Sequence, residues 1–510
     1  MLAIFICTVA AFTIYFYFTR KHSYWAKKGI KHEATIPLFG THYQNFFGIK
    51  SITQIVQNLY NQHENEKFIG YYRGNTPELI VKDPDMIRQI LSVDFSSFYA
   101  RGMGRDPVKE PLLLSLFHVE GDTWKLLRQR LTPAFTTNKL KNMFPLIIKC
   151  AEKMEKVVDD LTMKDEYDVR ELMARFTTEF IGACGFGIEM DSINNERSQF
   201  RELGRLMFNP PWKQKMLTVL YDLIPELFQY ISASNPVVED SMSEIFLNLR
   251  KQRNYKPIGR NDFVDLLLEL ESKGTIEGES LEKGNKDGTP EKIRMELDVK
   301  CMTAQLFVFF AAGFETSSSA TSYLIHELAL NPEIQRKVPE DIANVLARYD
   351  NKLCYEAVAE MRYLDMALKE SLRLFPSLGV LNRVCTRKYT FPGTDLTIDP
   401  GVKVMIPVHS IQNDEKYYDN PTEFRPERFL PEEVQKRHKF VYLPFGEGPR
   451  ACIGERLGHM QSLAGLAAML HKYSFEPSKS TKLHLEPDPW SNVVQAVIGG
   501  VPLKINKRNK

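Results

Sequence analysis

The stretch Pro444-Phe445-Gly446-Glu447-Gly448-Pro449-Arg450-Ala451-Cys452-Ile453-Gly454 is a glycine-rich loop that leads into an apolar helical segment, residues 455–470. Cys452 therefore stands just before a helix N-terminus, where free N–H groups and the helix dipole favour a thiolate. The glycines allow the backbone to approach a flat macrocycle closely and to offer N–H groups to the sulfur. Arg450 is placed to pair with a haem propionate. The loop predicts a haem site with Cys452 as the axial iron ligand.

A lone cysteine at a helix start is more often structural than metal-binding. Here Cys452 belongs to the longer pattern F-G-x-G-x-R-x-C-x-G, which spans residues 445–454. Phe445 and Gly446 open this pattern and are expected to contact the haem together with Arg450. The complete pattern favours the ligand interpretation over the structural one.

Composition places the chain among ordinary globular proteins. Of its 510 residues, 43% are hydrophobic and 25% are charged, so a large core is possible. The formal net charge of +2 gives no basic field of the kind that binds nucleic acid. The seven cysteines are scattered without a CxxC pair, which indicates reduced thiols on the cytosolic side.

The N-terminus differs from the rest of the chain. Residues 1–19 carry no Asp, Glu, Lys or Arg and are mostly apolar, and basic residues begin at Arg20. A helix of this length nearly spans the hydrocarbon core of a bilayer, and the positive-inside rule then places the bulk of the protein in the cytosol. A cleaved signal peptide is the alternative. We expect a membrane anchor over residues 1–19, a basic linker over 20–40 and one large domain over 41–510.

Helical patterns dominate the large domain, and strands are few. Residues 68–72 and 78–81 predict a hairpin, residues 298–330 predict one long helix, and the charged, glycine-rich residues 272–296 predict a mobile surface loop. Short strands are expected at residues 396–398, 402–406 and 501–505. The predicted fold class is mainly α with a minor β region (α+β).

The long predicted helix carries Ala311-Ala312-Gly313-Phe314-Glu315-Thr316-Ser317. The small residues Ala312 and Gly313 leave space beside the helix for a diatomic molecule. The carboxyl of Glu315 and the hydroxyl of Thr316 are an acid and an alcohol in sequence, suited to passing protons to reduced dioxygen. An ordinary polar patch on a buried helix is the alternative.

Two further groups of charged residues lie at helical spacing. Glu370 and Arg373 are three residues apart in an otherwise apolar stretch, so a buried pair is expected, with Arg428 as its third member and a structural role. An exposed pair is the alternative. Trp124 and Arg128 are four residues apart on a predicted helix, residues 123–131, and so share one face.

These motifs resemble those of cytochrome P450s, in the expected order and over about residues 30–510. The segments Phe186-Gly187-Ile188-Glu189 and Ile411-Gln412-Asn413-Asp414 are most similar to the insect microsomal branch that handles plant toxins and insecticides. The resemblance implies a haem-thiolate monooxygenase. It also implies that Trp124, Arg128 and Arg383 contact the haem propionates and that Ala312 contacts the cofactor. The residues expected to line the substrate cavity are Phe117, Phe307, Ala311, Val380 and Val494.

The resemblance further implies electrons from NADPH, delivered by NADPH–cytochrome P450 reductase, with cytochrome b5 as a further candidate donor, at the endoplasmic reticulum membrane. The basic residues Lys125, Arg130, Lys139 and Lys141 and the run 436–439 are candidates for docking them, or simply a solvated face. Few charges fall in the cavity segments, so a lipophilic substrate is expected. The apolar patch at residues 206–223 is either a membrane contact or core. Alternatives are an endogenous hormone or lipid as substrate, a haem-thiolate peroxide isomerase or dehydratase, and a haem-binding sensor or small-molecule carrier without turnover.

Overall fold

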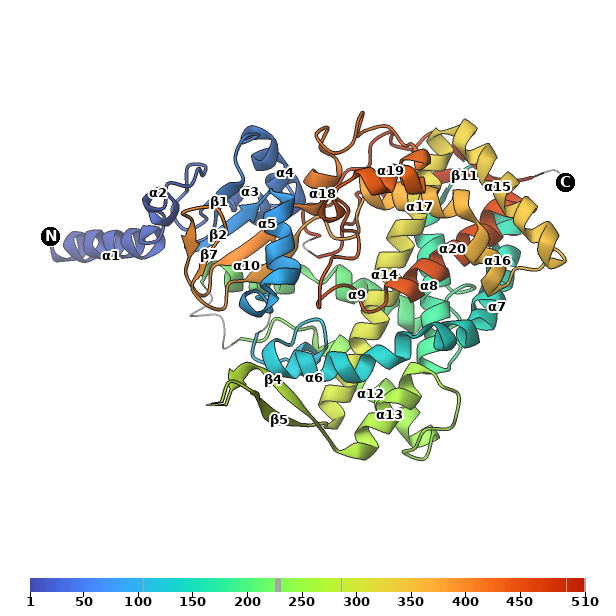
Figure 1. Ribbon diagram of the computed structural model, residues 1–510, viewed down its shortest axis with the longest axis horizontal. Helices are drawn as coiled ribbons and strands as arrows, with labels where there is room; N and C mark the ends of the chain where they lie inside the picture. The colour runs from blue at the N-terminus through green and yellow to red at the C-terminus, as the bar shows by residue number, and fades with distance from the viewer. Residues whose placement is uncertain (104, 225–230, 286, 492, 509–510) are drawn as a thin grey trace.

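The long helix α14 (Val299–Leu330) runs through the middle of the molecule and organises the fold (Figure 1). Its start is set by Asp298, whose side chain accepts a hydrogen bond from the N–H of Cys301 and so caps the helix. The predicted helix over 298–330 is confirmed. The computed structural model describes residues 1–103, 105–224, 231–285, 287–491 and 493–508.

Helices surround α14 on several sides and bury most of its surface. The closest neighbour is α8 (Val169–Ile181), eleven of whose side chains are buried. The other long helices that the structure describes beyond residue 40 are α4 (Ile52–Gln62), α6 (Gly121–Leu131), α7 (Thr137–Leu161), α9 (Gln199–Phe208), α10 (Trp212–Leu223), α12 (Pro236–Gln252), α13 (Phe263–Lys273), α15 (Pro332–Leu346), α17 (Arg362–Leu374) and α20 (Glu455–Lys472). With the exception of α4 and α10, these helices contribute residues to the main hydrophobic core.

A small sheet lies on the side of the anchor (Figure 1) and has the strand order β1-β2-β9-β6. Strands β1 (Phe68–Arg73) and β2 (Thr76–Val81) are antiparallel, which confirms the predicted hairpin. Strand β9 (Lys403–Ile406) joins β2 in parallel, and β6 (Leu381–Val384) joins β9 antiparallel. The remaining short strands include β3 (Tyr167–Asp168), β7 (Tyr389–Thr390), β8 (Thr397–Ile398), β10 (Tyr473–Pro477) and β11 (Pro502–Lys507). The fold is mainly α with minor β, as predicted.

The expectation of a loop over residues 272–296 is wrong. These residues form a β-hairpin of β4 (Thr275–Gly284) and β5 (Pro290–Glu296). Exposed charges oppose each other across the strands, with Glu277 facing Arg294 and Glu279 facing Lys292. Charge density and glycine content suggested a loop, whereas the alternation of charged and apolar residues in β5 is the period of a strand.

The N-terminal helix α1 (Leu2–Thr19) projects from the body, and none of its residues is buried (Figure 1). Its mean hydropathy of 2.0 and its 18 residues make it long and apolar enough to cross a membrane. The chain beyond it packs onto the sheet. Trp25 is fully buried and donates its indole N–H to the carbonyl of Tyr71 at 3.1 Å.

Candidate active site

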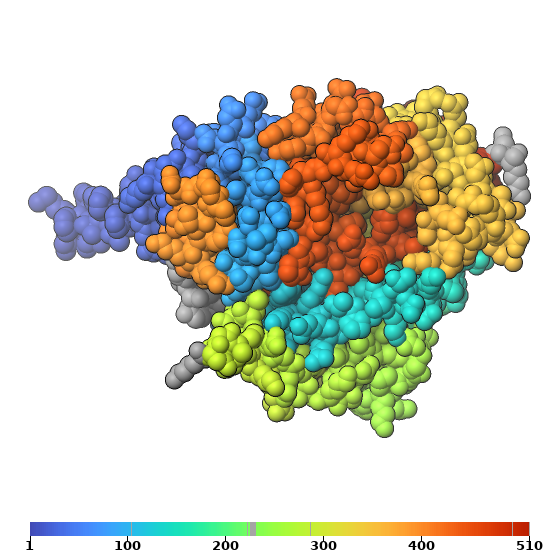
Figure 2. Space-filling model, viewed as in Figure 1, coloured from blue at the N-terminus to red at the C-terminus, as the bar shows by residue number. Residues whose placement is uncertain are grey.

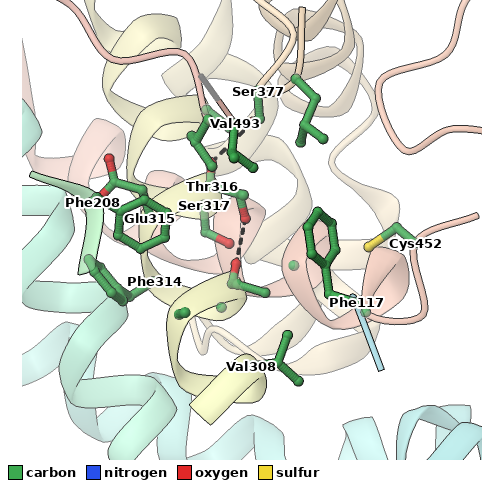
Figure 3. Close-up of a pocket in the computed structure, with 18 of the residues that line it drawn as sticks. Phe117, Phe208, Val308, Phe314, Glu315, Thr316, Ser317, Ser377, Cys452 and Val493 are labelled. Atoms are coloured by element: carbon green, nitrogen blue, oxygen red, sulfur yellow. Dashed lines mark hydrogen bonds between the residues drawn. The ribbon is translucent and has the colours of Figure 1, made fainter. Parts of the chain in front are cut away.

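A large internal cavity of about 900 Å³ lies beside α14 (Figure 3). The Cys452 sulfur points into it, and Thr316 lies across the cavity from the loop that carries this cysteine. Of the seven cysteines, all of which the structure describes, Cys452 is the one that lines the cavity. The loop and the long helix, which are far apart in sequence, therefore meet at one cavity.

The loop before Cys452 has a tight backbone that requires glycine. Gly446 and Gly448 adopt φ of +70° and +78°, and a Cβ on Gly448 would lie 1.8 Å from the carbonyl oxygen of Leu91. The N–H of Cys452 donates to the carbonyl of Phe445 at 2.9 Å, which closes the loop. This conformation holds the sulfur toward the cavity.

The helix start does not by itself hold Cys452 as a thiolate. Burial raises the pKa of the Cys452 thiol, and this outweighs a hydrogen bond from Gly454 and the positive charges of Arg128 and Arg101, which lower it. The N–H of Gly454 lowers the pKa, as expected from the loop, but burial reverses the net direction for the polypeptide alone. A bound metal ion deprotonates a coordinating thiol outright, so ligation does not depend on that depression.

Four arginines face the cavity near this loop: Arg101, Arg128, Arg383 and Arg450. Burial lowers the pKa of Arg450 to about 8, with further repulsion from Arg101 and Arg383. Burial likewise lowers the pKa of Arg383 to about 9 and that of Arg101 to about 10. In the part of the chain that the structure describes, Arg383 Nε and Arg450 Nε and Nη1 are buried without a hydrogen-bond partner. A cluster of this kind fits a ligand with more than one carboxylate, as haem has.

Trp124, on α6, contacts this arginine cluster through Arg450. The guanidinium carbon of Arg450 is 4.5 Å from the centroid of the Trp124 ring, and Arg450 Nη2 donates to the carbonyl of Val119 at 2.8 Å. Trp124, Arg128, Arg383, Arg450, Phe445, Gly446 and Ala312, the residues that we expected at the cofactor, all line the same cavity.

Sequence reasoning missed Arg101. It lies in the irregular segment between β2 and α6, where no helical or strand period distinguishes one arginine from another. Its side chain donates to the carbonyls of Phe117 and Arg450 at 2.8 and 3.2 Å. His118 also lines the cavity, and burial together with the charges of Arg101 and Arg105 lowers its pKa to about 3. His118 is therefore a neutral side chain beside the arginines.

The hydroxyl of Thr316 donates to the carbonyl of Ala312 at 2.7 Å, which adds a second hydrogen bond to an acceptor of the helix ladder. Ser377 donates to the carbonyl of Thr316 at 3.4 Å. Glu315 also lines the cavity, but its carboxylate binds the guanidinium of Arg170 on α8. The acid and the hydroxyl thus face the same cavity with different partners (Figure 3).

The five residues predicted to line the substrate cavity, Phe117, Phe307, Ala311, Val380 and Val494, all do so. Further apolar side chains at the cavity were not predicted, among them Phe208, Val308, Phe314 and Val493 (Figure 3). The cavity also has a charged recess formed by Asp168, Arg170, Glu171, Arg201 and Arg205. These residues lie on or just before α8 and on α9, far in sequence from every motif, and only the packing of these helices on α14 brings them there.

The charged triad lies away from the cavity. Arg373 Nε donates to Glu370 Oε2 at 2.7 Å, and Arg428 Nε donates to Glu370 Oε1 at 3.2 Å. Glu370 and Arg373 are fully buried, and Arg373 also donates to the carbonyls of Gln412 and Pro421. These contacts join α17 to the segment that precedes the cysteine loop.

The basic surface clusters are largely occupied by other groups. Lys141 pairs with Glu356 at 2.9 Å, Arg130 donates to the carbonyl of Glu277, and Lys439 pairs with Glu447 at 3.1 Å. In the apolar patch, Trp212 is 69% exposed. The patch is therefore at least partly on the surface rather than in the core.

Comparison with known proteins agrees with this geometry. Residues 32–499 match the family model of cytochrome P450. The chain is 38% identical to cytochrome P450 6B2 of Helicoverpa armigera over 504 residues, which cover 99% of this chain and 98% of that protein. It is 35% identical to cytochrome P450 6a2 of Drosophila melanogaster, with 96% of both chains covered. It is 34% identical to cytochrome P450 6k1 of Blattella germanica, with 97% of this chain and 94% of that one covered.

A cavity that brings a cysteine loop, four arginines and a threonine on the central helix together thus occurs in a chain that matches one family along nearly its whole length. The chain belongs to the cytochrome P450 family and is a haem-thiolate monooxygenase.

Proposed function

We propose that this enzyme inserts one oxygen atom from O₂ into a lipophilic small molecule, using electrons that a flavoprotein reductase takes from NADPH. The observation that carries the proposal is that Cys452 and Thr316, which sequence alone places 136 residues apart, line one cavity with a mainly apolar wall. A haem bound there supplies the iron at which O₂ is activated.

Cys452 would hold the haem iron, because it is the cysteine that lines the cavity. Arg101, Arg128, Arg383 and Arg450 would hold the propionates, and the unpaired donors of Arg383 and Arg450 support this assignment. Charge-assisted hydrogen bonds to a carboxylate would offset the cost of keeping these guanidinium groups buried.

Thr316 is the proposed proton donor to oxygen bound in the cavity. Its hydroxyl can leave the carbonyl of Ala312 and donate into the cavity without breaking the backbone ladder. Glu315 would hold its negative charge at the cavity wall through its ion pair with Arg170. The pair therefore offers a hydroxyl donor near an ionised carboxylate, and water in the charged recess would connect the two.

The proposed substrate is lipophilic, because phenylalanine and valine side chains such as Phe117, Phe208, Val308, Phe314 and Val493 line the cavity (Figure 3). We propose a plant toxin or an insecticide as the substrate class. An endogenous hormone or lipid is the second candidate. The charged recess favours a substrate, of either origin, that carries a polar group at one end.

The exposed apolar helix α1 supports an enzyme anchored in the endoplasmic reticulum membrane, with the catalytic domain in the cytosol. The proposed electron donor is NADPH–cytochrome P450 reductase, with cytochrome b5 as a second donor. Docking would use basic residues near α6, of which Lys125 is partly exposed.

The spectrum of the reduced, CO-bound protein tests the ligand assignment. A Soret band near 450 nm is the expected signature of thiolate ligation, and Cys452→Ala should abolish it while Cys354→Ala, a cysteine outside the cavity, should not. NADPH oxidation with purified reductase and a panel of lipophilic compounds tests the activity. If no compound in the panel increased NADPH oxidation, the proposed substrate class would be wrong.

A further inference from the structure

The hairpin of β4 and β5 lies directly against α6, the helix that carries Trp124 and Arg128 (Figure 2). It forms part of the connection between α13 and α14, and its two strands extend along the outer side of α6 (Figure 1). The first turn of α6 is therefore covered by an element that lies about 160 residues further along the chain.

Asp122, in the first turn of α6, binds the hairpin by two hydrogen bonds. Its Oδ2 accepts from the hydroxyl of Ser280 at 2.7 Å, and its Oδ1 accepts from the N–H of Leu281 at 2.5 Å. Ser280 is buried, so this contact is shielded from water. Farther along the helix, Arg130 donates to the carbonyl of Glu277 at 3.0 Å. The hairpin thus holds α6 at both of its ends.

Glu282 makes a second contact, to a different segment. Its Oε1 accepts a hydrogen bond from the hydroxyl of Tyr99 at 2.5 Å. Its carboxylate also lies over Gly121, since a Cβ there would be 2.5 Å from Glu282 Oε1. The negative charge therefore sits at the N-terminus of α6, where the helix dipole stabilises it.

Tyr99 stands two residues before Arg101, the arginine of the cluster that sequence reasoning missed. The same segment is joined to the start of α6 by the N–H of Gly102, which donates to Glu120 Oε1 at 2.7 Å. The hairpin consequently contacts both segments that bring arginines to the cavity from this side: the one with Arg101 and the one with Arg128.

We propose that the β4–β5 hairpin is a clamp that positions the propionate-binding arginines, with Asp122 and Glu282 as its positioning residues. None of the hairpin residues that the structure describes lines the cavity. The hairpin acts by keeping α6 and the Tyr99 segment in fixed positions relative to each other. The repulsion between Arg101 on the Tyr99 segment and Arg128 on α6 would otherwise push these two segments apart. This inference rests on the proposed haem site.

The chain offers a matched control on the same hairpin. Glu279 lies on β4 between the contacting residues, its side chain is exposed, and its partner across the strands is Lys292 on β5. Glu279→Ala removes a carboxylate from the hairpin without touching α6 or Tyr99. Tyr99→Phe removes the single hydroxyl that binds Glu282 and leaves both backbones unchanged.

The experiment measures the rate at which full-length holoprotein, well below its unfolding temperature, loses haem to an excess of apomyoglobin. Asp122→Ala and Glu282→Ala should each release haem roughly fivefold faster or more, as expected for the loss of one or two hydrogen bonds. Glu279→Ala should release it at the native rate. Tyr99→Phe should also accelerate release, and adding it to Glu282→Ala should have little further effect, because both remove one interaction.

Two readouts separate a clamp from a general loss of stability. Hydrogen exchange should increase in α6 and near Tyr99 but not in α20, and the CO-bound Soret band should stay at its native position. Native release rates for Asp122→Ala and Glu282→Ala would overturn the inference, and so would faster exchange throughout the protein. Absence of the 450 nm band in the native protein would instead contradict the proposed haem-thiolate site.

Discussion

The guanidinium of Arg450 lies over the indole of Trp124, with 4.5 Å between its central carbon and the ring centroid. The two residues come from elements more than 300 positions apart, the cysteine loop and α6. Arg450 is 2% exposed, yet Nε and Nη1 have no hydrogen-bond partner among the described residues. The contact with Trp124 holds the Arg450 guanidinium in place while two of its nitrogens remain available to bind an anion.

Arg450→Gln should have opposite effects on the apoprotein and on the holoprotein. It removes a charge that burial and two neighbouring arginines disfavour, so the apoprotein should be no less stable in thermal unfolding. Haem affinity should fall by roughly 10-fold or more, because charge-assisted hydrogen bonds contribute about 1.5–3 kcal/mol. Haem titration followed by absorbance measures the loss of haem affinity. Calorimetry of the apoprotein measures whether its thermal stability is retained. A large loss of apoprotein stability would contradict the first.

The triad predicts a strong dependence of stability on Glu370. Glu370→Gln leaves Arg373 and Arg428 without their shared carboxylate, and breaking a buried pair costs roughly 3–5 kcal/mol. Thermal unfolding of the holoprotein measures the loss. Glu433→Gln, which removes an exposed ion pair with Lys436, should leave the Tm unchanged.

Thr316→Ala should uncouple electron use from product formation. The variant keeps the helix ladder, since only the side-chain bond to the carbonyl of Ala312 is lost. We expect the CO-bound spectrum to persist, with a larger share of NADPH electrons recovered as hydrogen peroxide. Ser318→Ala is the matched control, because its hydroxyl donates to the carbonyl of Glu315 from a fully buried position outside the cavity. Equal peroxide yields from the two variants would argue against a role for Thr316.

Gly448→Ala should destabilise the cysteine loop severely. Its φ of +78° strains any other residue, and the new Cβ would collide with the carbonyl of Leu91. Strain and overpacking together cost about 3 kcal/mol. Gly393→Ala has a similar φ of +70° but open space around it, so strain alone should cost about 1 kcal/mol. The difference in Tm between the two variants measures the collision.

Lowering the pH should reduce the stability of the folded protein, and part of this loss should come from His409. Burial and the charge of Arg373 lower the pKa of His409 from 6.5 to about 4. Because the unfolded chain takes up this proton and the folded chain does not, stability is fully present above pH 6.5 and is lost as the pH falls toward 4. His409→Asn should reduce the loss of Tm between pH 7 and pH 5. An identical slope in both proteins would exclude this contribution.

Sequence determined the elements whose pattern is local. The long helix α14, the β1–β2 hairpin and the loop around Cys452 are each specified by residues adjacent in the chain: a capping aspartate, alternating apolar residues and obligatory glycines. The β4–β5 hairpin was missed because its charges and glycines are typical of loops. Its strand form depends on cross-strand pairing and on contacts with α6.

Tertiary structure decided what the cavity is made of. Arg101, the charged recess and the Arg170–Glu315 pair carry no sequence signal, because each depends on segments that meet only when α6, α8 and α9 pack around α14. The direction of the pKa shift of Cys452 also depends on that packing, since burial outweighs the local helix start. The residue proposed to hold the iron, Cys452, is recognisable from the sequence around it. The charges and walls of the cavity arise from contacts between distant segments.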